Sequence, residues 1–196
     1  MEKTVAFCTL GCKVNQYESE AVLEQFIKRG YRAVDFADKA DVYVVNTCTV
    51  THLSDRKSRQ MIRRAKHENP NAVLAVMGCY AQTAPEVVEK IQGVDIVIGT
   101  NGRTRVVEAV EQFLEQKKTM NLVRKLEKDC CFEPLAIDGS GQTHRRAFLK
   151  VQDGCNQFCS YCIIPYARGR IRSRSIADSV HEARRMAAAG FSELVL

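Results

Sequence analysis

The chain has 196 residues, of which 45% are hydrophobic and 27% are charged, and its net charge is +6. No apolar run approaches the roughly 18 residues that a membrane helix needs, which excludes a membrane protein. The N-terminus lacks the long apolar stretch and small-residue cleavage site of a signal peptide, so we expect a cytoplasmic location. The mild positive charge is compatible with a polyanionic partner, although it is weak evidence for one.

The first part of the chain alternates apolar runs with amphipathic segments. We expect strands at 3–8, 41–46, 72–77 and 95–98, and helices at 18–29, 55–68, 86–91 and 105–118. Because the runs at 41–46 and 72–77 are continuously apolar, their strands are predicted to be parallel and buried on both faces. The pattern predicts an α/β fold, an open doubly wound domain over residues 1–119.

The periodicity decays after residue 119, and we expect a linker over 120–145, where acidic, proline and glycine positions interrupt the pattern. A strand at 146–151, a helix at 175–189 and a strand at 192–196 follow. Residues 146–196 are therefore predicted to start a second domain. Since a strand–helix–strand unit cannot bury itself, we expect this second domain to be cut short.

The nine cysteines are the main chemical signal. Their number is odd and export signals are absent, so they favour metal binding or redox chemistry over disulfides. Three of them, Cys155, Cys159 and Cys162, have the spacing C-x3-C-x2-C. Three thiolates can hold three irons of a cubane cluster and leave the fourth iron open, whereas electron-transfer clusters usually take four cysteines. A zinc site or a chance grouping is the alternative.

A second set of three cysteines is dispersed in the sequence. Cys12, Cys48 and Cys79 each follow the end of a predicted strand, and the carboxyl ends of parallel strands share one edge of a sheet. Gly11 and Gly78 precede two of them and permit close approach of the backbone. We therefore expect a second three-cysteine site, the alternative being ordinary buried cysteines. The other cysteines, for which we expect no function, are Cys8, Cys130 and Cys131.

A basic segment follows the close cysteines, with arginines at every second position from 168 to 174. In an extended loop such residues project to one side, ready for phosphates or carboxylates, although a solvated loop is the alternative. The basic residues between Arg56 and Lys66 are interpreted as the solvated face of a helix. The four histidines have no spacing that suggests a metal site.

Together these motifs resemble the radical S-adenosylmethionine methylthiotransferase family. The resemblance rests on the close triplet with Tyr161 before its last cysteine and on the segment that follows it, Pro165 to Arg170. It also rests on the residues around the dispersed cysteines: Thr9 to Glu20, Asn46-Thr47-Cys48-Thr49-Val50 and Gly78-Cys79-Tyr80-Ala81-Gln82. It covers essentially the whole chain. The residues after Cys12 are most similar to the enzymes that act on N6-threonylcarbamoyladenosine at position 37 of tRNA. Family members continue through a partial (β/α) barrel and end in an RNA-binding domain, so the chain resembles an N-terminal fragment.

The resemblance implies two 4Fe–4S clusters and S-adenosylmethionine as cofactors. Cys155, Cys159 and Cys162 would hold the cluster that binds S-adenosylmethionine and generates a 5′-deoxyadenosyl radical. Cys12, Cys48 and Cys79 would hold an auxiliary cluster that carries the sulfur for transfer to C2 of the adenine. Tyr161 would lie near S-adenosylmethionine, where we also place Arg168 and Arg170. The partners would be an electron donor and tRNA, with Arg168, Arg170, Arg172 and Arg174 steering phosphates of the anticodon loop.

Several alternatives stay open at this point. The substrate could be an isopentenyladenosine in tRNA or a residue of a ribosomal protein. The 196 residues could also form a cluster-binding or zinc-binding module that does not turn over by itself, and we expect no methylthiolation by these residues alone. The sequence identifies no catalytic side chain.

Overall fold

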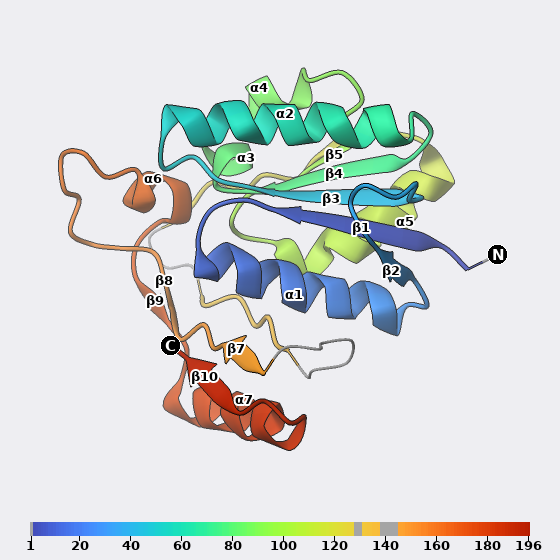
Figure 1. Cartoon of the computed structure of the whole chain (residues 1–196). Helices are drawn as coiled ribbons and strands as arrows, with labels where there is room; N and C mark the ends of the chain where they lie inside the picture. The colour runs from blue at the N-terminus through green and yellow to red at the C-terminus, as the bar shows by residue number, and fades with distance from the viewer. Residues whose placement is uncertain (1, 128–130, 138–144) are drawn as a thin grey trace.

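The computed structural model describes residues 2–127, 131–137 and 145–196. A parallel sheet with the strand order β2-β1-β3-β4-β5-β6 forms the centre of the molecule (Figure 1). Each neighbouring pair of strands in it is parallel. Its strands are β1 (Thr4–Thr9), β2 (Arg32–Val34), β3 (Val42–Thr47), β4 (Val73–Gly78), β5 (Ile96–Val97) and β6 (Met120–Asn121).

Helices cover both faces of this sheet, with α1 and α5 on one side and α2 and α4 on the other (Figure 1). The side chains of β3 explain this arrangement because successive residues of a strand point to opposite faces. Val42 and Val44 pack into the core beside α1 and α5, and Tyr43 and Val45 pack into the core beside α2. The helices are α1 (Lys13–Lys28), α2 (His52–Glu68), α3 (Cys79–Thr83), α4 (Pro85–Glu89) and α5 (Val106–Gln116), the last preceded by the 3-10 turn η1 (Arg103–Arg105). The predicted doubly wound α/β fold is confirmed.

The structure also contains elements that the sequence pattern did not predict. β2 is a short edge strand, and α3 begins directly at the end of β4. β6 lies in the stretch that we predicted to be a linker, yet Met120 pairs with Ile96 and extends the sheet. α1 begins at Lys13, five residues before the predicted start, and the buried Tyr17 belongs to this added segment.

The second part of the chain contains the parallel unit β7–α7–β10, in which β10 pairs with β7. A small antiparallel pair, β8 with β9, holds the base of the loop that carries the close cysteines. This arrangement agrees with the predicted start of a (β/α) unit, although the strand expected at 146–151 ends at Phe148 and β8 begins only at Gln152. The elements are β7 (Arg146–Phe148), β8 (Gln152–Asp153), α6 (Ile164–Arg168), β9 (Arg172–Ser173), α7 (Ile176–Ala188) and β10 (Glu193–Val195).

The two parts share one hydrophobic core, and α1 lies between them (Figure 1). Ala147 and Met186 of the second part belong to the same buried cluster as Val22 and Phe26 of α1. The buried hydroxyl of Tyr17 lies 2.6 Å from the carbonyl oxygen of Leu135 and 3.0 Å from a carboxylate oxygen of Glu182. α1 therefore fixes how the loops of the two parts face one another.

Candidate functional site

The dispersed cysteines lie where the sequence predicts, at the carboxyl ends of three neighbouring strands. Cys12 follows β1 at the start of α1, Cys48 follows β3, and Cys79 follows β4 as the first residue of α3. Cys48 and Cys79 are buried, whereas Cys12 is exposed. Parallel strands bring their following loops to one edge, which is where ligands bind in open α/β sheets.

Two glycines shape this edge. Gly11 has a φ of +106°, and a β-carbon at this position would lie 2.9 Å from both Cβ and Sγ of Cys48. Gly78 has a φ of +101°, and a β-carbon there would lie 2.6 Å from the carbonyl oxygen of Thr47. Since an L side chain is strained in this backbone region and would collide here, glycine is what lets the loop of Cys12 pack against Cys48.

Asn15 links the loops around the dispersed cysteines. Its Nδ2 donates to the carbonyl oxygens of Leu10 at 2.6 Å and Thr47 at 3.1 Å, so that it ties the end of β1 to the end of β3. Its Oδ1 lies 3.8 Å from Sγ of Cys12 and accepts a hydrogen bond from Nη2 of Arg168 at 2.6 Å. One buried amide thus connects both cysteine regions.

The close cysteines lie on a single loop between β8 and α6. The backbone N–H of Cys155 donates to the carbonyl of Gly169 at 3.0 Å, and that of Cys162 donates to the carbonyl of Cys159 at 2.9 Å. Cys159 is exposed, and Tyr161 is 89% exposed. The loop is closed at its base and open at its tip, so its thiols and Tyr161 can be reached by a ligand.

The segments that follow the two sets of cysteines meet at one end of the sheet. α6, which follows the close cysteines, lies beside α3, which begins at Cys79 (Figure 1). The hydroxyl of Thr100 donates to the carbonyl of Ala167 at 2.6 Å and joins the end of β5 to α6. The strand-end loops of the first part therefore lie against α6, the helix that follows the cysteine loop of the second part.

A buried cluster of charged side chains, here called the ion cluster, lies behind this junction. Among the described residues it contains four cations and three carboxylates: Arg103, Lys150, Arg168 and Arg172 with Glu18, Glu133 and Asp153. Glu18 of α1 is its centre, with ion pairs to Lys150 at 2.6 Å, Arg168 at 2.9 Å and Arg103 at 3.1 Å. Asp153 pairs with Lys150 at 2.6 Å and with Arg168 at 2.9 Å.

The ion pairs determine the protonation of these groups. Burial alone would raise the pKa of Glu18, but the charges of Arg103, Arg168 and Lys150 lower it to about 2. Burial would likewise raise the pKa of Asp153, and Lys150 and Arg168 hold it well below its usual range. Glu18 and Asp153 are therefore ionised at neutral pH and hold the loop of the close cysteines against α1.

Burial raises the pKa of the Cys79 thiol, and the nearby Arg168 opposes that rise. Glu18 and, to a smaller extent, Cys48 add to the rise in the pKa of Cys79. Bound metal and cationic neighbours are what convert a cysteine thiol into the thiolate that acts as a ligand. Arg168 is positioned to favour that thiolate at Cys79.

We expected the four arginines that follow the close cysteines to project to one side of an extended loop, and this expectation was wrong. These residues do not project together from an extended loop, because α6 and β9 interrupt it. Arg168 is 4% exposed and pairs with Glu18 and Asp153, and Arg172 is also buried in the ion cluster. Arg174 forms an ion pair with the buried Glu182. Of the four, Arg170 remains open to solvent, with its guanidinium over the ring of Phe158.

The described residues show no group of three or more cysteine, histidine or acidic side chains within metal-binding reach. The donor chemistry nevertheless fits an iron–sulfur cluster, since each region offers three free thiols from one edge of the sheet or one loop. Cys8 lies inside β1, where burial raises the pKa of its thiol to about 11. Cys131 is exposed, and Cys130 lies outside the described residues.

The fold and the site define a class: an α/β protein that presents cysteines at strand ends and on an adjacent loop. Residues 4–99 match the family described as uncharacterized protein family UPF0004. The chain is 50% identical over 193 residues to the threonylcarbamoyladenosine tRNA methylthiotransferase MtaB of Bacillus subtilis (98% of this chain, 43% of the relative). It is 43% identical over 194 residues to the enzyme of that name from Aquifex aeolicus (98% of this chain, 47% of the relative).

A third relative carries another substrate in its name. The tRNA-2-methylthio-N(6)-dimethylallyladenosine synthase of Methylacidiphilum infernorum is 33% identical over 193 residues, which cover 96% of this chain and 41% of the relative. Over nearly its whole length the chain is similar to these methylthiotransferases. It spans less than half the length of the relatives it matches. None of the helices in the described part of the chain has both the length and the apolar character of a membrane span.

Proposed function

We propose that the chain is part of a radical S-adenosylmethionine enzyme that transfers a methylthio group to tRNA. The observation that carries the proposal is the meeting of the two cysteine regions at one end of the sheet, joined by Asn15 and Arg168. A methylthio transfer needs two reactive centres within reach of one base. Loops held face to face by a buried ion cluster meet that need.

The proposed substrate is N6-threonylcarbamoyladenosine at position 37 of tRNA, modified at C2. Two relatives named for threonylcarbamoyladenosine share 50% and 43% identity with the chain, and the relative named for dimethylallyladenosine shares 33%. The residues that follow Cys12 in the sequence support the same substrate. An isopentenyladenosine tRNA or a ribosomal-protein residue is the alternative substrate.

In this proposal Cys155, Cys159 and Cys162 hold one 4Fe–4S cluster, and Cys12, Cys48 and Cys79 hold an auxiliary one. The first supplies radical chemistry with bound S-adenosylmethionine, and the second supplies the sulfur. Tyr161 and Arg170 are exposed on the rim of the cysteine loop and would contact S-adenosylmethionine or the RNA. Arg168 would not contact S-adenosylmethionine or the RNA directly, because its guanidinium already binds Glu18, Asp153 and Asn15.

The chain's own residues position the two centres. The backbone bond from Cys155 to Gly169 closes the base of the cysteine loop, and Asn15 holds the loop of Cys12 against the end of β3. The proposal also includes an electron donor, the anticodon loop as the RNA element bound, and a cytoplasmic location. It retains the division into an auxiliary-cluster domain at 1–119, a connecting stretch at 120–145 and a radical S-adenosylmethionine unit from 146.

The test is a substitution in the gene of the host organism, followed by nucleoside analysis of its tRNA. Replacing Cys155 by alanine should abolish 2-methylthio-N6-threonylcarbamoyladenosine and leave its unmethylthiolated precursor. Cys131→Ala is the matched control, since Cys131 is exposed and lies outside both triplets, and it should change nothing. Normal methylthiolation in the Cys155→Ala strain would refute the proposal. Loss of the dimethylallyl form instead would assign the enzyme to the alternative substrate.

A second candidate function is a metal-binding module without turnover. The free thiols of each region are also the ligands that zinc prefers, so the same residues would suit such a module. Zinc in place of iron after anaerobic preparation, with no brown colour, would support the module over the enzyme.

A further inference from the structure

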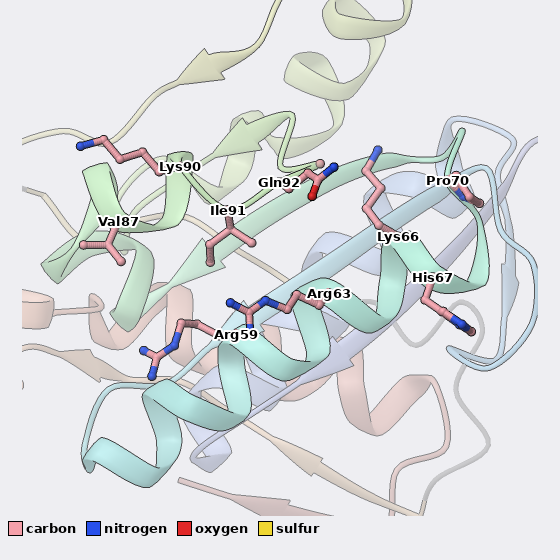
Figure 2. A pocket seen from close by; sticks show the side chains of 10 residues that line it. Arg59, Arg63, Lys66, His67, Pro70, Val87, Lys90, Ile91 and Gln92 are labelled. Carbon is pink, nitrogen blue, oxygen red and sulfur yellow. The ribbon is translucent and has the colours of Figure 1, made fainter.

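A basic groove lies on the face of the sheet covered by α2, outside the cysteine regions. It is about 680 Å³ in volume and lies between α2 and the segment that runs from α4 to the turn at Gly93. Figure 2 shows the side chains of Arg59 and Arg63 entering from α2, with Val87 and Ile91 on the opposite wall. The cationic and titratable side chains that line it are Arg59, Arg63, Lys66, His67 and Lys90.

The lining contains no acidic residue. Lys66 is neutralised, because its ammonium group pairs with Asp95 at 3.1 Å and donates to the carbonyl of Ala72. Arg59 donates to the hydroxyl of Tyr80 at 3.0 Å, a neutral partner that leaves its charge uncompensated. Within the described parts of the chain, Arg63 and Lys90 have no ion pair and no hydrogen bond from their side chains. At least three positive charges in the groove therefore lack a counter-charge in the protein.

The spacing of the cations indicates a ligand with repeated negative charge. The like charges Arg59 and Arg63 are four residues apart on one face of α2, about 6 Å along the helix at 1.5 Å per residue, and His67 follows at the same spacing. Like charges at this spacing destabilise an isolated helix, so the arrangement costs stability unless an anion lies beside it. A single small anion would satisfy one or two of these charges, whereas a chain of phosphates would satisfy all of them.

The groove begins close to the cysteine edge and leads away from it. Its Arg59 end touches Tyr80, the residue after Cys79, through the hydrogen bond and with the guanidinium 5.8 Å from the ring centre. The hydroxyl of Ser58, next to Arg59, donates to the carbonyl of Cys48 at 3.2 Å. A ligand that reacts at the cysteine edge could therefore extend along α2 in the same bound state.

We propose that this groove binds the sugar–phosphate backbone of the RNA substrate, on the stem beside the loop that contains the reacting base. The identity of the RNA in this inference rests on the proposed function. The groove adds the surface that would contact the phosphates of that RNA. Phosphate contacts position a nucleic acid without reading its sequence, and they are made mainly by arginine and lysine. They release counterions, which makes the affinity depend on salt.

The experiment measures binding of the purified chain to a fluorescently labelled anticodon stem–loop RNA over a range of salt concentrations. The test variant is Arg63→Gln with Lys90→Gln, since neither side chain has a partner whose loss would unfold the protein. The control variant is Lys39→Gln with Lys118→Gln, which removes the same charge from exposed residues at the amino-terminal end of the sheet. Thermal melting of both variants checks that each is folded.

Loss of two phosphate contacts should lower the slope of log K against log salt by about 1.4 to 1.8, at roughly 0.7 to 0.9 for each contact. At 0.1 M salt this corresponds to a loss of affinity of roughly thirtyfold. The control variant should keep the slope of the unaltered chain. An unchanged slope in the test variant, an equal loss in the control, or equally tight binding of polyglutamate in the groove would overturn the proposal.

The experiments distinguish a failure of the groove proposal from a failure of the proposed function. If the groove proposal fails, the test variant binds RNA normally while the Cys155→Ala strain still lacks the methylthio nucleoside. If the proposed function fails, the Cys155→Ala strain is normal, and the groove variant still reports whether α2 binds an RNA backbone.

Discussion

Replacing Glu18 by glutamine is the sharpest test of how the two parts of the chain are held together. Glu18 is fully buried and pairs with Lys150, Arg168 and Arg103, two of which belong to the second part. The substitution keeps the size of the side chain and removes its charge. The ion cluster would then hold four cations against two carboxylates.

Two independent routes give the size of the effect. The pKa of Glu18 falls from an ordinary value of 4.5 to about 2, and one pH unit corresponds to about 1.4 kcal/mol, so its ionised form contributes on the order of 3 kcal/mol. Removing one partner from a buried ion pair costs about 3 to 5 kcal/mol, because the other charge is left uncompensated. Both routes predict a loss of about 3 kcal/mol in the free energy of unfolding.

The assay is urea unfolding followed by circular dichroism. With a slope of about 3 kcal/mol per molar urea, the midpoint should fall by about 1 M. Glu111→Gln is the control, since Glu111 pairs with Arg29 at the surface, where such a pair contributes at most about 1 kcal/mol. A midpoint for Glu18→Gln no lower than that of Glu111→Gln would refute the reasoning.

Three further predictions follow from the same contacts. The folded pKa of Glu18 is below its unfolded value, so its contribution is present above pH 4.5 and is lost as the pH falls toward 2; the unfolding midpoint of the unaltered chain should therefore drop more over this range than that of Glu18→Gln. Gly11→Ala should lower the unfolding free energy by more than about 1 kcal/mol and reduce iron uptake, since φ is +106° and the new methyl group would meet Cys48. The control is Gly30→Ala, where φ is +81° and no atom lies within 4 Å; it should lower the unfolding free energy less and leave iron uptake unchanged. Thr51→Ala should cost about 1 kcal/mol, because the Thr51 hydroxyl caps α2 by accepting from the Ser54 amide at 3.1 Å, whereas Thr51→Ser should retain the cap; thermal melting compares the two.

The sequence predicted the sheet well because the apolar runs of β3 and β4 are buried on both faces and carry a clear signal. It also predicted which strand ends carry cysteines, since a parallel sheet places its carboxyl ends together. β2 and β6 were missed because they are short edge strands, partly exposed and paired on one side. Their existence depends on pairing with distant strands, which a local pattern does not contain.

The ion cluster could not be predicted from local pattern. Glu18 lies in a polar stretch of α1 that is typical of a solvated helix face, and its partners Lys150 and Arg168 are more than 130 residues away in the sequence. Arg168 lies beside the cysteine loop, as its position in the sequence indicates, but it pairs with the buried Glu18 and Asp153. The alternation of arginines in the sequence does not show that α6 interrupts the loop. Asn15 falls inside the motif that carries the family resemblance, and that was the one signal for it.

The iron content of the chain after anaerobic reconstitution tests the central claim most directly. The account predicts about eight irons per chain, or two cubane clusters. Replacing Cys12, Cys48 and Cys79 together by alanine should leave about four irons, and so should replacing Cys155, Cys159 and Cys162, while Cys131→Ala should retain the full amount. Full iron in either triplet variant, or zinc in place of iron in the unaltered chain, would contradict the claim that each cysteine region holds a cluster.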